Sequence, residues 1–156
     1  MDISLMRRYM GMINGLGSYV DKQTKTVELI GKGEVKEIAI RTPFLLRDET
    51  NLELRLRKEG EDIFLHDNSW LYMYLDDYGI AIDSTSLRQK RYGDFISTLM
   101  KRNDFGYDQN WRWFYKMCTP KTTEDNLWKF IHSLQMISDL ALVKTLRPLA
   151  LPVLQR

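Results

Sequence analysis

Side chains that could support metal or nucleophilic chemistry are few and scattered in this sequence. The two histidines, His66 and His132, stand far apart, and neither has a second ligand at the spacing of a zinc motif. Cys118 is the only cysteine, so no intramolecular disulfide can form, and no signature of a catalytic thiol surrounds it. We therefore predict no catalytic residue, no metal site and no cofactor.

Carboxylates are the remaining candidates for chemistry. A metal-dependent hydrolase needs several of them together, because hard divalent cations prefer oxygen ligands. Asp62 and Asp67 flank a short apolar run, and Asp76 and Asp77 follow in a segment where they match the solvated face of a helix. A nuclease-like hydrolase that uses Asp62 and Asp67 is therefore kept as the third hypothesis.

Basic and aromatic side chains gather between residues 84 and 116. Arginines beside exposed rings are what proteins use to bind single-stranded nucleic acid. The bases that would contact phosphates are Arg88, Arg91, Arg102, Arg112 and Lys116. Over 111–116, however, alternate residues can form core and surface without any ligand, and a net charge of +2 argues against tight phosphate binding. A small nucleic-acid-binding or regulatory module is the second hypothesis.

Charge is distributed unevenly along the chain. Residues 44–80 carry nine acids and four bases (4 − 9 = −5), whereas residues 84–116 carry seven bases and three acids (7 − 3 = +4). The acids can mimic phosphate on a basic partner, and an arginine beside a tryptophan can anchor an acidic partner. The predicted protein-binding residues are Asp62, Asp67, Asp76, Asp77, Arg112 and Trp113.

Apolar periodicity predicts the elements that position these residues. Period-two patterns or short apolar runs predict strands at 27–30, 37–44, 51–58, 62–66, 105–107 and 111–118. Apolar residues three and four apart predict helices over 3–16, 70–78, 84–102 and from 122 to about 141. We expect Asp67 and Asn68 to cap the helix at 70–78, and the strand 62–66 to lie last in the sheet.

These elements predict one α+β domain over residues 1–156. It contains a small antiparallel sheet of about four to six strands, an N-terminal helix, a short helix after the central hairpin and two longer C-terminal helices. The parts are 1–20 (N-terminal helix), 26–82 (sheet and short helix), 84–147 (helix, hairpin, helix) and 148–156 (tail). No apolar run is long enough to span a membrane, and we expect no membrane partner.

Four motifs carry a resemblance to a known family. They are Thr42-Pro43-Phe44, the strand 52–56 (LELRL), the segment 62–80 (DIFLHDNSWLYMYLDDYGI) and residues 136–140 (MISDL). Together they resemble, over roughly residues 38–140, a bacterial and phage domain of unknown function, number one thousand eight hundred and twenty-eight. The resemblance implies a bacterial or phage origin and the cytoplasm of a bacterial host, with no settled activity. The turn 66–69 lacks the family's second aspartate and its glycine, which puts any carboxylate-dependent activity in doubt.

The first hypothesis is therefore a non-enzymatic protein-binding protein of phage or mobile-element origin. Its partner would be a host protein, and one specific form is an inhibitor of a host defence nuclease, or of that nuclease bound to nucleic acid, as anti-CRISPR proteins are. The absence of a catalytic constellation, the small size and the divided charge support this hypothesis. The identity of the target, the binding surface and the oligomeric state stay open.

Overall fold

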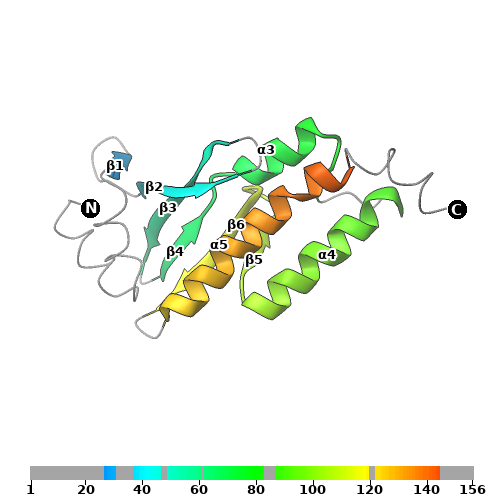
Figure 1. The fold of residues 1–156 in the computed structure, drawn as a ribbon. Coiled ribbons are helices and arrows are strands. Elements are labelled where there is room, and N and C mark those ends of the chain that lie inside the picture. The colour runs from blue at the N-terminus through cyan, green and yellow to red at the C-terminus, as the bar shows by residue number, and fades with distance from the viewer. Residues whose placement is uncertain are drawn as a thin grey trace, which may run out of the picture.

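Six strands and three helices make up the part of the chain that the computed structural model describes, residues 27–30, 37–46, 49–60, 62–82, 87–119 and 122–144. The strands are β1 (Val27–Ile30), β2 (Glu37–Leu45), β3 (Asn51–Glu59), β4 (Asp62–His66), β5 (Gly106–Asp108) and β6 (Trp113–Cys118). The helices are α3 (Trp70–Asp77), α4 (Leu87–Asn103) and α5 (Glu124–Ser138) (Figure 1). The predicted N-terminal helix and C-terminal tail lie outside the described residues.

The strands form one antiparallel sheet in the order β1-β2-β3-β4-β6-β5. The predicted single α+β domain is confirmed. The expectation that β4 lies last in the sheet is wrong. It is an inner strand, because β6 returns from beyond α4 and pairs with it, placing Phe64 opposite Met117.

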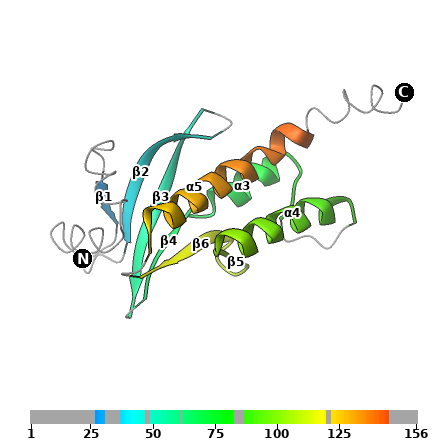
Figure 2. The same ribbon diagram turned by 60° about the horizontal axis from the view of Figure 1, so that its bottom comes forward.

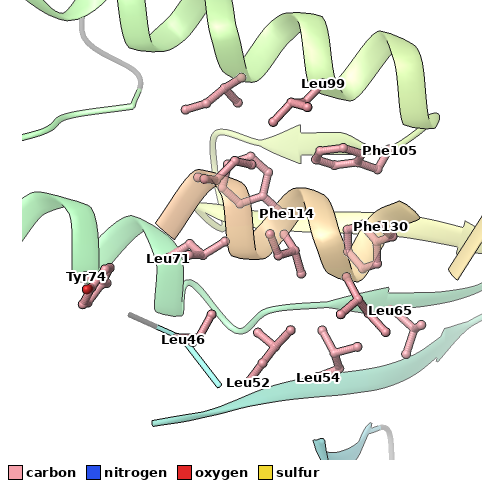
Figure 3. Close-up of a cluster of buried hydrophobic side chains, with 14 of the residues drawn as sticks. Leu46, Leu52, Leu54, Leu65, Leu71, Tyr74, Leu99, Phe105, Phe114 and Phe130 are labelled. Carbon is pink, nitrogen blue, oxygen red and sulfur yellow. The ribbon is translucent and has the colours of Figure 1, made fainter. Parts of the chain in front are cut away.

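The helices cover one face of the sheet (Figures 1 and 2). In β3 every second residue is a fully buried leucine, as the period-two pattern predicts for a face turned to the core. Figure 3 shows Leu52 and Leu54 of β3 facing Phe130 of α5, with Phe114 of β6 in the same cluster. The opposite face of the sheet carries the other half of each strand's side chains.

Local signals set the helix ends. The Thr123 hydroxyl accepts a hydrogen bond of 3.3 Å from the Asn126 N–H, which caps α5. The Asp67 carboxylate accepts a hydrogen bond of 3.0 Å from the Leu71 N–H and so caps α3, although the residue directly before that helix is Ser69. In the described part of the chain no helix has the length and apolar character that a membrane span requires.

Candidate functional site

The face of the sheet opposite the helices brings aromatic and charged side chains together. Cross-strand partners share a face, and the register places Arg55 beside His66 and His66 beside Tyr115. Two positions along, Arg57 lies beside Phe64. These residues lie on strands that are distant in sequence, so the cluster exists only in the folded chain.

His66 lies at the centre of this face and is completely buried. Its Nδ1 atom accepts a hydrogen bond of 3.0 Å from the Asn68 N–H, so the ring proton is on Nε2. That Nε2–H donates to the Glu37 carboxylate on β2. Since both ring nitrogens take part in hydrogen bonds, His66 has a structural role and is not placed to act as a general base.

Burial and charge set the ionisation of this pair. Burial lowers the pKa of His66, and the positive charges of Arg55 and Arg57 lower it further, while the hydrogen bond to Glu37 opposes both effects. Burial alone would raise the pKa of Glu37, but the hydrogen bond from His66 and the neighbouring positive charges hold that pKa below its usual value. The pair is therefore a neutral imidazole that donates to a carboxylate.

Two tryptophan rings stack in succession outward from His66. The His66 and Trp113 rings lie 3.8 Å apart between centroids at an interplanar angle of 27°. Trp113 stacks in turn on Trp111, with centroids 5.0 Å apart and an angle of 7°. Trp113 is 7% exposed and Trp111 is 59% exposed, so the stack runs from a buried histidine to a tryptophan at the surface.

The turn that carries Trp111 is held by several hydrogen bonds. The Asp108 Oδ1 atom accepts from the N–H groups of Asn110 and Trp111, each at 2.9 Å. The Arg112 N–H donates to the Asp108 carbonyl at 2.7 Å, and the Ser69 hydroxyl donates to the Trp111 carbonyl at 2.6 Å. The turn is thus fastened both within itself and to the start of α3.

Arg112 adopts an unusual backbone conformation for its residue type. Its φ of 59° lies in the left-handed region, which residues with a Cβ adopt at an energetic cost. Its guanidinium lies over the Tyr72 ring of α3, with Cζ 4.7 Å from the ring centroid. We call Tyr72, Trp111 and Arg112 together the Trp111 surface.

The arginines of β3 are already paired with acids. Arg55 Nε lies 2.9 Å from Glu53 Oε1, and Arg57 Nη2 lies 2.7 Å from Glu59 Oε1. Arg57 Nη1 also lies 3.6 Å from Glu37 Oε1, and Arg57 Cζ lies 6.0 Å from the centroid of the Trp111 ring. The sheet face is therefore a mixture of charges of both signs, not a positive patch.

The four predicted acidic docking residues do not form one surface. Asp62, Asp76 and Asp77 are exposed, the first on β4 and the others on α3. Asp67 is completely buried, and its carboxylate accepts hydrogen bonds from Leu71 and Phe114. The prediction that Asp67 contacts a partner is wrong, because its carboxylate is needed to join α3 to β6. Burial raises the pKa of Asp67 to about 6, against the lowering effect of these N–H donors.

Two of the predicted aromatic and basic contacts are also wrong. Trp113 cannot be an open anchor, because His66 and Trp111 each stack against its ring. Lys116 is buried on the helix side of the sheet, where its Nζ donates to the Asp104 carbonyl at 2.8 Å. Arg102 and Arg112 are exposed, while the side chains of Arg88 and Arg91 lie outside the described residues.

The residues proposed for hydrolysis lie apart. Asp62 and Asp67 stand at opposite ends of β4, a separation of roughly 16 Å at the rise of a strand. Within the described residues no three metal-ligating side chains gather. Burial raises the pKa of the Cys118 thiol to about 12, which keeps that thiol protonated.

Trp111 and Tyr72 were not among the predicted site residues: Trp111 was placed at the start of a strand, and Tyr72 was assigned no role. The sequence did contain one indication that Trp111 belongs to a turn. An aspartate side chain can accept hydrogen bonds from the N–H groups two and three residues further along the chain, and so close a turn. Asp108 does this, so β6 begins only at Trp113.

Comparison of the chain with protein families, with curated proteins and with solved structures finds no match. The resemblance drawn from the four motifs therefore remains a prediction. Ser69, the last residue of the turn 66–69, has a φ of 62°, which lies in the left-handed region that favours glycine.

Proposed function

We propose that this chain is a non-catalytic protein-binding protein whose partner docks on the Trp111 surface. The observation that carries the proposal is a large aromatic side chain, 59% exposed, that is held rigidly. Binding energy at protein interfaces concentrates in a few residues, and tryptophan, tyrosine and arginine are the commonest among them. The Trp111 surface consists of one residue of each kind.

Rigidity favours this role. A side chain that must be ordered on binding costs about 0.5–1.5 kcal/mol. Trp111 avoids most of that cost, because its ring stacks on Trp113 and its carbonyl accepts a hydrogen bond from Ser69. The left-handed backbone at Arg112 is a strained conformation of the kind that clusters at binding sites. These features prepare the surface before a partner arrives.

Nucleic-acid binding is less well supported by the same face. A groove for single-stranded nucleic acid needs positive charge that tracks the phosphates. Arg55 and Arg57 are instead neutralised by Glu53, Glu59 and Glu37. Lys116, one of the five predicted phosphate contacts, is buried. A protein partner, which presents charges of both signs, fits this face better.

The finer part of the proposal concerns the partner's identity. The resemblance to a bacterial and phage family implies a bacterial or phage origin, and on that basis we propose a host protein as the target. A host defence nuclease, alone or bound to its nucleic acid, is therefore the first partner to test, and inhibition would follow from occlusion of its surface.

Affinity capture with matched variants tests the proposal. The tagged chain is incubated with a bacterial lysate, beside Trp111→Ala and the control Phe95→Ala, which removes a partly exposed ring from α4. We expect a protein that the parent chain and Phe95→Ala retain and Trp111→Ala loses. With the purified partner, Trp111→Ala should weaken Kd at least about tenfold. Equal capture by all three proteins would refute the proposal.

A further inference from the structure

Arg112 differs from the other arginines that approach the stack. Arg55 and Arg57 have carboxylate partners, whereas in the described part of the chain no carboxylate lies within ion-pair distance of Arg112. Its guanidinium is exposed and lies over Tyr72. The side-chain N–H groups of Arg112 also make no hydrogen bond to any residue that the structure describes. This fork of N–H groups is therefore available to a partner.

The chemistry of the fork points to an anion. Guanidinium binds carboxylate or phosphate through two parallel hydrogen bonds, which fix the direction of approach as well as adding energy. Trp111 precedes Arg112 in sequence and offers an apolar ring that is 59% exposed and can be covered by a partner. A group that satisfies both residues carries an anionic oxygen pair close to an apolar side chain.

Neighbouring acids decide between the two anions. Asp76 lies one helical turn beyond Tyr72, about 5–6 Å away between Cβ atoms, and it is exposed. Asp108 belongs to the same turn as Arg112. Glu59 forms an ion pair with Arg57, whose guanidinium lies over the Trp111 ring. A phosphate backbone would bring repeated negative charges against these acids. A single carboxylate would bring only one negative charge to Arg112 and would meet less of that repulsion.

We infer that the Trp111 surface recognises a protein segment in which one aspartate or glutamate lies next to an apolar residue. The carboxylate pairs with the Arg112 fork, and the apolar side chain covers the Trp111 ring. This inference rests on the proposed function and adds the chemical class of the partner segment. It also assigns Arg112 a specific role, as the residue that selects for the acid.

Selection from a library of short random peptides on the full-length chain tests the inference. Enriched peptides should carry an acid within two positions of an aromatic residue, leucine or proline. They should bind Phe95→Ala as they bind the parent chain, and bind Arg112→Gly at least about tenfold more weakly. Glycine suits the left-handed backbone at position 112, so this variant keeps the fold. Arg112→Glu should recover binding when the acid of the peptide is replaced by lysine.

The outcomes separate the inference from the proposed function. Peptides that lose binding with Trp111→Ala but not with Arg112→Gly overturn the inference and leave the proposed function standing. Peptides that depend on neither residue overturn both. Binding of a short single-stranded oligothymidine that Trp111→Ala abolishes also overturns both, in favour of nucleic acid.

Discussion

Asp67 and Phe114 exchange two hydrogen bonds across the fold. The Phe114 N–H donates to Asp67 Oδ1 at 2.9 Å, and the Asp67 N–H donates to the Phe114 carbonyl at 3.2 Å. The same carboxylate accepts from the Leu71 N–H through its other oxygen. One buried side chain therefore connects the end of β4, the start of α3 and the start of β6.

Asp67→Ala should destabilise the chain by about 3 kcal/mol, because it leaves two buried N–H groups without acceptors. The measurement is urea unfolding followed by circular dichroism. Asp76→Ala is the control, since it removes an exposed acid from α3 and should leave the midpoint almost unchanged. A similar small effect for both variants would contradict the role assigned to Asp67.

The stability contributed by Asp67 should depend on pH in an unusual direction. Its pKa of about 6 in the folded chain lies above the value near 3.8 of a solvated aspartate. Between these values the folded state holds a proton that the unfolded state has released, so stability falls as pH rises from 4 to 6, by about 3 kcal/mol in total.

The comparison with Asp67→Asn isolates this effect. The variant does not titrate at position 67, so the difference in unfolding free energy, parent minus Asp67→Asn, should decrease over that pH window. His66 and Glu37, whose lowered pKa values make stability fall as pH falls, are present in both proteins. A difference that is flat or rises with pH would show that Asp67 is ionised in the folded chain throughout.

Two glycines should respond in opposite ways to alanine. A Cβ at Gly106 would lie 2.7 Å from Cζ of Tyr115, whose ring crosses the β5 backbone, so Gly106→Ala should cost about 1–3 kcal/mol. A Cβ at Gly93 in α4 meets nothing within 4 Å, and Gly93→Ala should gain about 0.5–1 kcal/mol of helix propensity. Thermal unfolding of the two variants should therefore shift in opposite directions, and shifts of the same sign would contradict the packing at Gly106.

The hydroxyl of Ser69 and its left-handed backbone should have separate effects on stability and binding. Ser69→Ala loses the hydrogen bond to the Trp111 carbonyl but keeps a Cβ at φ 62°, so it should lose about 1 kcal/mol. Ser69→Gly loses the same bond but relieves the backbone, and its stability should return close to that of the parent. Both variants release the turn and should weaken partner binding. Unchanged binding in both would show that the Ser69 bond does not position Trp111.

Local pattern accounts for most of the elements and little of their arrangement. The alternating leucines of β3 predicted that strand and its buried face. The inner position of β4 depends on pairing with β6, which follows β4 only after two helices and β5. That pairing leaves no period in the sequence of either strand. The nucleic-acid hypothesis also required Lys116 at the surface, although its Nζ donates to the Asp104 carbonyl inside the fold.

The candidate site was predicted only in part. Arg112 was identified because arginine beside tryptophan is typical of interfaces. Trp113 was chosen in place of Trp111, since sequence cannot tell which of two tryptophans is enclosed when both lie near a turn. The choice depends on the burial of His66, and that depends on Glu37 from another strand.

The nearly parallel Trp111 and Trp113 rings also give the chain an optical reporter of its own. Two indoles at 5.0 Å and 7° have strongly coupled electronic transitions, and only the outer one is exposed to solvent. A ligand that covers or tilts Trp111 would change the near-ultraviolet circular dichroism of the pair. Occupancy of the surface can thus be followed in the unlabelled protein, and the signal should vanish in Trp111→Ala.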